Sequence, residues 1–117
     1  LRKVQPLGRR LFDLDLWISG LRRDQSAERA STPLLSLAGR PDGSDVWKLN
    51  PLVDWSKELV HDYLAAHGLP HNPLIDRGYR SIGCAPCTVP SSGGDERGGR
   101  WPGFDKRECG LHTRTKK

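Results

Sequence analysis

Residues 83–112 read GCAPCTVPSSGGDERGGRWPGFDKRECGLH and contain every cysteine of the chain. Cys84 and Cys87 form a CxxC pair, which places two thiolates on one tight turn, where they can share a metal centre or form a disulfide. Cys109 stands apart from this pair. Three basic residues near it in sequence would favour its thiolate form if they also lie near it in space, namely Lys106, Arg107 and His112. The stretch therefore offers a two-thiolate clip and a separate candidate nucleophile.

The composition indicates one modest domain with a small apolar core. Of the 117 residues 35% are hydrophobic, and 13 glycines and 9 prolines predict abundant loops. The chain has no methionine and opens on LRKV, so we expect it to be a piece of a larger protein. An odd number of cysteines, one CxxC pair and a lone Cys, does not fit a disulfide framework and favours a reducing, cytoplasmic location. No apolar run approaches membrane-spanning length.

The net charge of +5 and the pI near 9.5 fit two interpretations. A basic surface attracts anions such as nucleotides, sulfate, phosphate or nucleic acid, but it also simply keeps a protein soluble. For the charged segment 21–29, the sequence pattern favours a solvated turn or helix end over an anion-binding loop. Its arginines suit phosphate or sulfate oxygens, whereas its lack of a clean period is more typical of a solvated turn or helix end.

Short strands and helices are predicted along the first part of the chain. Apolar residues at helical spacing indicate a short amphipathic helix within residues 1–14. Strand-forming residues indicate strands at 14–18, 33–38 and 46–50, each bounded by turn residues.

The clearest helix is predicted after Asp54. Asp54 is a favourable N-cap and Gly68 a favourable stop. One apolar face lies between them, formed by Trp55, Leu59, Val60, Tyr63 and Leu64. A connecting loop is expected over 69–79. The Gly-rich segment 91–103 should be mobile unless a ligand or partner orders it.

The cysteines alone are compatible with several kinds of site. Structural zinc and iron–sulfur clusters both use CxxC and normally need four protein ligands, but this chain has one further cysteine and four histidines without zinc-ribbon spacing. The context of Gly83 and Pro90 does not indicate a thioredoxin-like motif. A metal site completed by cysteines outside this chain fits better. For Cys109, an activated nucleophile and an incidental exposed thiol both stay open.

Several motifs occur in a fixed order along nearly the whole chain. They are RKVQPL at 2–7, GLRRDQS at 20–26, WKLNPL at 47–52 with DW at 54–55, SIGCAPCT at 81–88, DERGGRW at 95–101 and RECGLH at 107–112. Together they resemble the C-terminal half of the assimilatory adenylyl-sulfate (APS) reductases, members of the phosphoadenylyl-sulfate/adenylyl-sulfate reductase family. A set of ordered motifs is far more specific than any one of them.

The resemblance implies an α/β fold, the C-terminal part of an adenine-nucleotide alpha-hydrolase-like fold with a loop-rich C-terminal tail. Residues 1–80 would be the C-terminal portion of the reductase α/β domain. Residues 81–117 would hold the CxxC loop, the Gly-rich segment and the tail with the catalytic cysteine. Members reduce adenylyl sulfate to sulfite and AMP in sulfate assimilation. They form an S-sulfocysteine that thioredoxin or a glutaredoxin-like thiol donor cleaves.

The resemblance also implies roles for individual residues. Cys109 matches the nucleophile, and Cys84 and Cys87 match ligands of a [4Fe–4S] cluster whose other two cysteines would precede Leu1. Five residues match substrate-binding positions, namely Lys3, Arg29, Arg97, Arg100 and His112. Relatives that use the 3′-phosphorylated substrate commonly lack the cluster cysteines, so these cysteines favour adenylyl sulfate. With two of four ligands, the isolated chain is expected to be inactive.

Two other functions stay open. A phosphoadenylyl-sulfate reductase belongs to the same family. A non-catalytic basic module that binds nucleic acid through a CxxC metal knuckle would need two more ligands and aromatic residues interleaved with basic ones, and neither is evident in this chain. We therefore expect neither a nucleic-acid partner nor a membrane, whereas a homo-oligomer is compatible with the sequence.

Overall fold

The computed structural model of the chain forms two compact units, which we describe separately. Unit 1 comprises Leu1–Leu21, Thr32–Val53 and Glu108–Lys117, and unit 2 comprises Arg22–Ser31 and Asp54–Arg107. The residues that the structure describes are 3–106, 108, 110, 112 and 115–116. Among these residues, no helix is long and apolar enough to cross a membrane.

Unit 1 contains a four-stranded mixed sheet in the order β1-β3-β2-β4. Its strands are β1 (Leu16–Ile18), β2 (Leu35–Gly39), β3 (Asp45–Leu49) and β4 (Thr115–Lys116). β1 runs parallel to β3, and β2 is antiparallel to both β3 and β4. The first three strands confirm the α/β prediction and lie close to their predicted positions. β4 was not predicted, because two polar residues near the end of the chain carry no strand signal.

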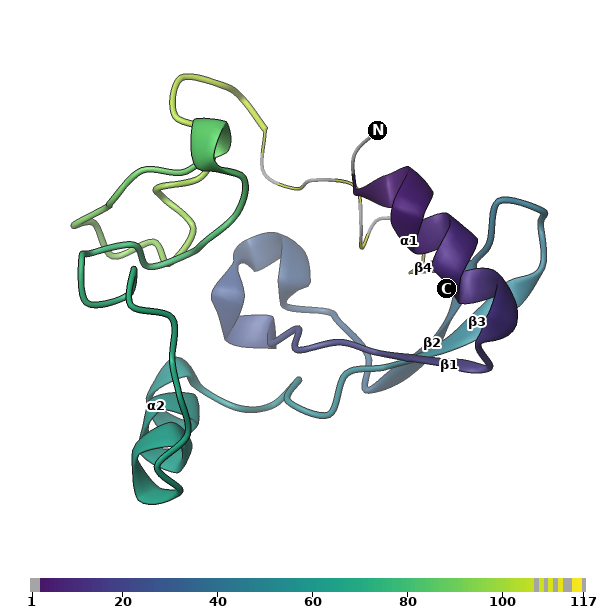
Figure 1. Cartoon of the computed structure of the whole chain (residues 1–117), viewed down its shortest axis with the longest axis horizontal. Helices are drawn as coiled ribbons and strands as arrows, with labels where there is room; N and C mark the ends of the chain where they lie inside the picture. The colour runs from purple at the N-terminus through teal and green to yellow at the C-terminus, as the bar shows by residue number, and fades with distance from the viewer. Residues whose placement is uncertain (1–2, 107, 109, 111, 113–114, 117) are drawn as a thin grey trace. The chain divides into compact units, whose positions relative to one another are not determined.

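One face of the sheet is covered by the N-terminal helix, α1 (Val4–Arg10), which continues into the short 3₁₀ helix η1 (Leu11–Asp13) (Figure 1). The prediction of a short helix within residues 1–14 is confirmed. Its apolar side buries Leu11 against the sheet. The small core formed there consists of Leu11, Ala38 and Val46, with Leu7 and Trp17 packed against it.

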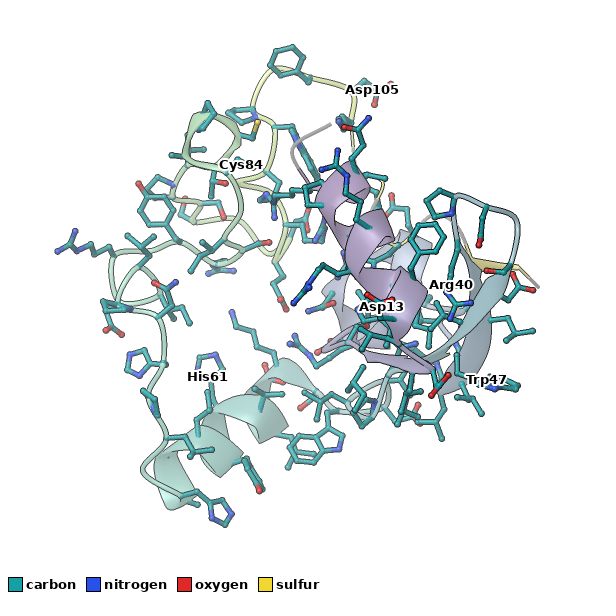
Figure 2. The ribbon with its side chains drawn as sticks, turned by 45° about the vertical axis from the view of Figure 1, so that its right-hand side comes forward. Asp13, Arg40, Trp47, His61, Cys84 and Asp105 are labelled. Atoms are coloured by element: carbon teal, nitrogen blue, oxygen red, sulfur yellow. The ribbon has the colours of Figure 1, made fainter. Side chains whose placement is uncertain are left out.

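The other face of the sheet is apolar and largely uncovered within the described part of the chain. Strand partners in register share a face, so Leu16, Trp47 and Leu37 lie together, beside Ile18, Leu49 and Leu35. Trp47 is 50% exposed and Ile18 60% exposed. Figure 2 shows the Trp47 side chain projecting away from α1. The sheet of unit 1 therefore has one packed face and one open apolar face.

Arg40 ties the β2–β3 turn to the end of the N-terminal helix (Figure 2). Its Nε donates to the carbonyl oxygen of Leu11 at 2.8 Å, and its Nη2 donates to that of Leu14 at 2.7 Å. Its Nη1 donates to the carbonyl oxygen of Asp45 at 2.6 Å. Gly43, at φ +88°, allows the tight turn that places Arg40 there. One guanidinium thus joins three backbone segments.

Unit 2 contains one longer helix, α2 (Lys57–Ala66), and three 3₁₀ turns, η2 (Arg23–Gln25), η3 (Ala27–Arg29) and η4 (Ala85–Cys87). The predicted stop at Gly68 is confirmed, because its φ of +58° ends the helix in the left-handed conformation. α2 buries none of its residues, so the predicted apolar face does not form a core within the described chain.

The predicted N-cap of α2 is wrong. Ser56, not Asp54, caps the helix, and its hydroxyl accepts the backbone N–H of Leu59 at 3.1 Å. Asp54 instead forms an ion pair with Arg23. The backbone N–H of Lys57 donates to the Asp24 carboxylate at 2.7 Å, so an acidic residue distant in sequence also serves the start of α2.

The Arg40→Ala substitution should lower the free energy of unfolding by about 1–3 kcal/mol, because three charge-assisted hydrogen bonds to backbone carbonyls are lost. Urea denaturation of the full-length protein measures this change. Arg40→Lys is the matched control, since an ammonium keeps the charge but cannot reach three diverging acceptors with a planar fork. Wild-type stability in both variants would contradict the structural role of Arg40.

Candidate functional site

The CxxC turn forms a compact clip in unit 2. The backbone N–H of Cys87 donates to the carbonyl oxygen of Cys84 at 2.9 Å, which closes the 3₁₀ turn η4. The hydroxyl of the buried Thr88 donates to the same carbonyl oxygen at 2.9 Å. Both cysteines are free thiols; Cys84, labelled in Figure 2, is exposed, and Cys87 is partly buried. The turn therefore presents two thiols from one short segment.

A short antiparallel pairing joins this clip to the Gly-rich segment. Thr88 and Arg100 form an isolated β-bridge. The Val89 N–H donates to the Gly99 carbonyl at 2.9 Å, and the Trp101 N–H donates to the Cys87 carbonyl at 2.9 Å. The segment that carries the predicted substrate-binding arginines is thus aligned directly with the cysteine turn.

Two glycines permit this alignment. A β-carbon on Gly99 would lie 2.1 Å from the carbonyl oxygen of Val89, a distance that real β-carbons do not adopt. A β-carbon on Gly83 would lie 2.2 Å from Nη2 of Arg100. The Arg100 guanidinium therefore lies beside the backbone immediately before Cys84, where a side chain at position 83 would have to displace it.

Three cations gather around the ring of Trp101. The guanidinium carbon of Arg100 lies 4.5 Å from the ring centroid, that of Arg97 lies 5.7 Å away, and Nζ of Lys106 lies 5.7 Å away. All three distances are within the range of cation–π attraction. Trp101 is buried and has a φ of 51°, which is uncommon for a residue other than glycine. The basic cluster is thus arranged around the buried indole of Trp101.

A cavity of about 250 Å³ opens beside this cluster. Its charged lining is mixed rather than uniformly positive, with Arg97, Arg100, Lys106, Glu28, Asp95 and Asp105. The volume is below the 300–1,000 Å³ of most small-molecule sites. The cavity can therefore hold an anionic group on its basic side rather than a whole nucleotide.

Arg22 is the residue that sequence reasoning missed. It is 8% exposed, and its Nη2 bonds Oε2 of Glu96 at 2.8 Å while its Nε bonds Oδ1 of Asp24 at 2.9 Å. This buried network ties segment 21–29 to the segment that carries Arg97. Segment 21–29 forms two 3₁₀ turns, as the turn interpretation predicted, but it is not fully solvated, because Arg22 and Arg29 are both buried. No local pattern could reveal a pair 74 positions apart.

The remaining predicted site residues have different surroundings. Arg29 donates to Oε1 of Gln25, and its neighbours Ser26 and Glu28 line the cavity of unit 2. In unit 1, Lys3 is the N-cap residue of α1. His112, also in unit 1, stacks on Trp17 with ring centroids 5.4 Å apart. The substrate-binding roles of these three residues stay predictions.

Two predicted features need separate mention. Cys109 lies outside the described residues. No group of three or more His, Cys, Asp or Glu residues able to hold a metal occurs in the described part of the chain. The role of Cys84 and Cys87 as ligands of a larger set stays a prediction.

Residues 1–90 match the family described as "Phosphoadenosine phosphosulfate reductase domain". A curated relative, "Adenosine 5'-phosphosulfate reductase" from Salinibacter ruber, is 51% identical over 97% of this chain and 44% of its own length. The protein of the same name from Rhodococcus opacus is 47% identical over 97% of this chain and 45% of its own length. The chain thus spans less than half of these relatives.

A solved structure has a similar fold. It is the crystal structure of phosphoadenylyl-sulfate (PAPS) reductase from Candida auris, a phosphate complex, which aligns with a TM-score of 0.61 and 30% sequence identity. The alignment covers 74% of this chain and 40% of that chain. This likeness agrees with the predicted α/β fold, the C-terminal part of an adenine-nucleotide alpha-hydrolase-like fold.

The Gly99→Ala substitution should destabilise the protein by roughly 1–3 kcal/mol, because the new methyl group overlaps the Val89 carbonyl and separates the paired segments. Hydrogen exchange should show faster loss of protection at the amides of Val89 and Trp101. Gly94→Ala is the matched control in the same segment, since a β-carbon on Gly94 meets no atom within 4 Å. Equal exchange in the two variants would rule out the proposed need for glycine at 99.

Proposed function

The chain belongs to the phosphoadenosine phosphosulfate reductase domain family, and we propose that the full-length protein containing it reduces adenylyl sulfate to sulfite and AMP in sulfate assimilation. The observation that carries this proposal is the alignment of the CxxC turn with Arg100. A two-thiol clip and a basic cluster around Trp101 lie side by side in unit 2. That combination suits a sulfur-transfer enzyme with a thiolate-bound cluster and an anionic substrate.

The reaction begins at Cys109. Its thiolate attacks the sulfur of adenylyl sulfate, the bond from sulfur to the bridging oxygen breaks, and AMP leaves with the electron pair. Cys109 then carries the sulfo group as an S-sulfocysteine. A donor thiolate of thioredoxin or a glutaredoxin-like protein attacks the Cys109 sulfur, and sulfite departs. A second donor thiol resolves the mixed disulfide, so the donor supplies both electrons.

The basic residues of this chain would bind and polarise the substrate. Arg97 and Arg100 lie on the basic side of the cavity, where guanidinium groups can bond phosphate or sulfate oxygens. Positive charge placed there stabilises the negative charge that develops on the departing AMP. We assign supporting contacts to substrate to Lys3, Arg29 and His112, because these residues match substrate-binding positions of the family.

A [4Fe–4S] cluster fits the donor atoms that the chain presents. Cys84 and Cys87 are free thiols on one turn, and soft thiolates are the usual ligands of iron–sulfur clusters. These two residues would hold one side of the cluster, and two cysteines outside this chain would hold the other. When bound, the cluster would supply structural support, and the guanidinium of Arg100, which lies beside Gly83, would add positive charge next to the cysteine turn.

Adenylyl sulfate is a better candidate than its 3′-phosphorylated form. The curated relatives with 47–51% identity are named adenosine 5'-phosphosulfate reductases, whereas the structural neighbour named a PAPS reductase is 30% identical. The CxxC pair points the same way, because family members that use the 3′-phosphorylated substrate commonly lack it.

Incubation of the full-length protein with adenylyl sulfate, without thiol, should add one sulfo group to Cys109. Intact-mass measurement and peptide mapping detect the adduct, and thioredoxin should remove it. Cys109→Ser is the control that should stay unmodified. A folded wild-type protein that forms no adduct, or forms it on Cys84 or Cys87, would sink the proposed mechanism.

Cys84→Ser and Cys87→Ser should each reduce the bound iron and the visible absorption of the cluster in the full-length protein, because a hard hydroxyl is a poor substitute for a thiolate. Iron analysis and absorption spectra make the measurement. Cys109→Ser should keep wild-type iron, which separates the cluster cysteines from the nucleophile. Full iron content in both CxxC variants would show that other residues bind the metal.

A further inference from the structure

Trp17 makes aromatic contacts in unit 1 to which the proposed function assigns no role. It lies on β1 in register with Lys48 of β3, on the same face of the sheet. Lys48 is 2% exposed, and its Nζ lies 4.7 Å from the centroid of the Trp17 ring. The imidazole of His112 stacks on the same indole, with centroids 5.4 Å apart and planes 13° from parallel. Trp17 therefore joins the centre of the sheet to the C-terminal tail.

The described tail residues contact unit 1 at two further places. A β-carbon on Gly110, whose φ is +83°, would lie 3.8 Å from Cγ2 of Val4, in the first turn of α1. β4 pairs with β2 through Leu37 and Ala38. A small cavity of about 30 Å³ is lined by residues of α1, of the sheet and of the tail, among them Val4, Trp17, Gly110 and His112. The described tail residues at 110, 112 and 115–116 thus lie against α1 and the sheet.

These contacts all lie after residue 109 in the sequence. Gly110 and His112 follow it closely, and the turn of α1 that they approach begins directly after Lys3. A two-residue strand such as β4 gives little hold by itself, because short strand pairs are marginal in water. A stacked aromatic pair adds attraction beyond the area that it buries. The Trp17–His112 stack is therefore a side-chain contact that helps to fix the tail on unit 1.

We propose that Trp17 is a positioning residue of the reductase, which acts through His112 to hold the tail that carries Cys109 beside the first turn of α1. This inference rests on the proposed function. Trp17 itself touches no reacting atom. It raises the fraction of time for which the tail lies on unit 1, and thereby the rate of the attack by Cys109 on bound substrate. The expected effect of losing the stack is about a threefold to tenfold slower attack.

The test compares Trp17→Ala with Trp47→Ala in the full-length protein. Trp47 is the matched control, because it lies on the same sheet but on the opposite face, away from α1 (Figure 2). Hydrogen exchange should rise in tail peptides covering 108–117 in Trp17→Ala only. Single-turnover formation of the sulfo adduct should slow about threefold to tenfold in the same variant. Trp17→Phe, which keeps a ring for stacking, should recover most of both properties.

A double-mutant cycle separates positioning from general destabilisation. If Trp17 acts through His112, the Trp17→Ala/His112→Ala variant should form the adduct no more slowly than the slower single variant. Unfolding curves of all variants show whether the fold is intact. Unchanged tail exchange in a folded Trp17→Ala protein would overturn the proposal, as would multiplicative losses in the double variant.

Failure of the proposed function gives a different result. A wild-type protein that forms no adduct would overturn both the proposed function and the positioning role. Hydrogen exchange would still distinguish the two failures, because it reports the Trp17–His112 contact without any chemistry. A freed tail with an unchanged adduct rate would overturn positioning alone and leave the proposed function in place.

Discussion

Unit 2 depends on one close approach between two backbone segments. The carbonyl oxygen of Val89 occupies the space where a side chain on residue 99 would begin, so only glycine allows the pairing. That pairing brings the cysteine turn beside Arg100 and Trp101. Gly99 therefore allows two features that are separate in the sequence to lie side by side. These are the soft metal ligands and the basic anion-binding cluster.

Local signals predicted the local structure well. The helix within 1–14, the strands at β1 to β3 and the stop at Gly68 depend on neighbouring residues, which the sequence displays directly. Contacts between distant segments were predicted poorly. The N-cap of α2 is Ser56 and not Asp54. The carboxylate of Asp24, 33 positions before Lys57, also accepts a hydrogen bond from the backbone N–H of Lys57 at the start of the helix. Arg22 had no assigned role, because Glu96 lies far along the chain. The residues of the candidate site were predicted mainly from the order of the motifs along the chain.

Unit 1 and unit 2 would contribute different things to the proposed reaction. Unit 2 supplies basic side chains and two thiols, whereas unit 1 supplies the sheet and helix that the described tail residues contact. The sheet of unit 1 has one open apolar face, with Trp47 and Ile18 at least half exposed. Apolar faces of this kind normally belong to an interface. The relatives are more than twice as long as this chain, and so have further chain with which such a face can be covered.

The pairing of β4 with β2 has a consequence for the protein between turnovers. A strand at the edge of a sheet presents unpaired N–H and C=O groups, and such an edge can template pairing with another molecule. While the tail is docked, β4 occupies the edge at Leu37 and Ala38. Release of β4 from this edge would leave the backbone groups of Leu37 and Ala38 unpaired. The protein would then be more prone to self-association, so β4 protects the edge of the sheet as well as fixing the tail.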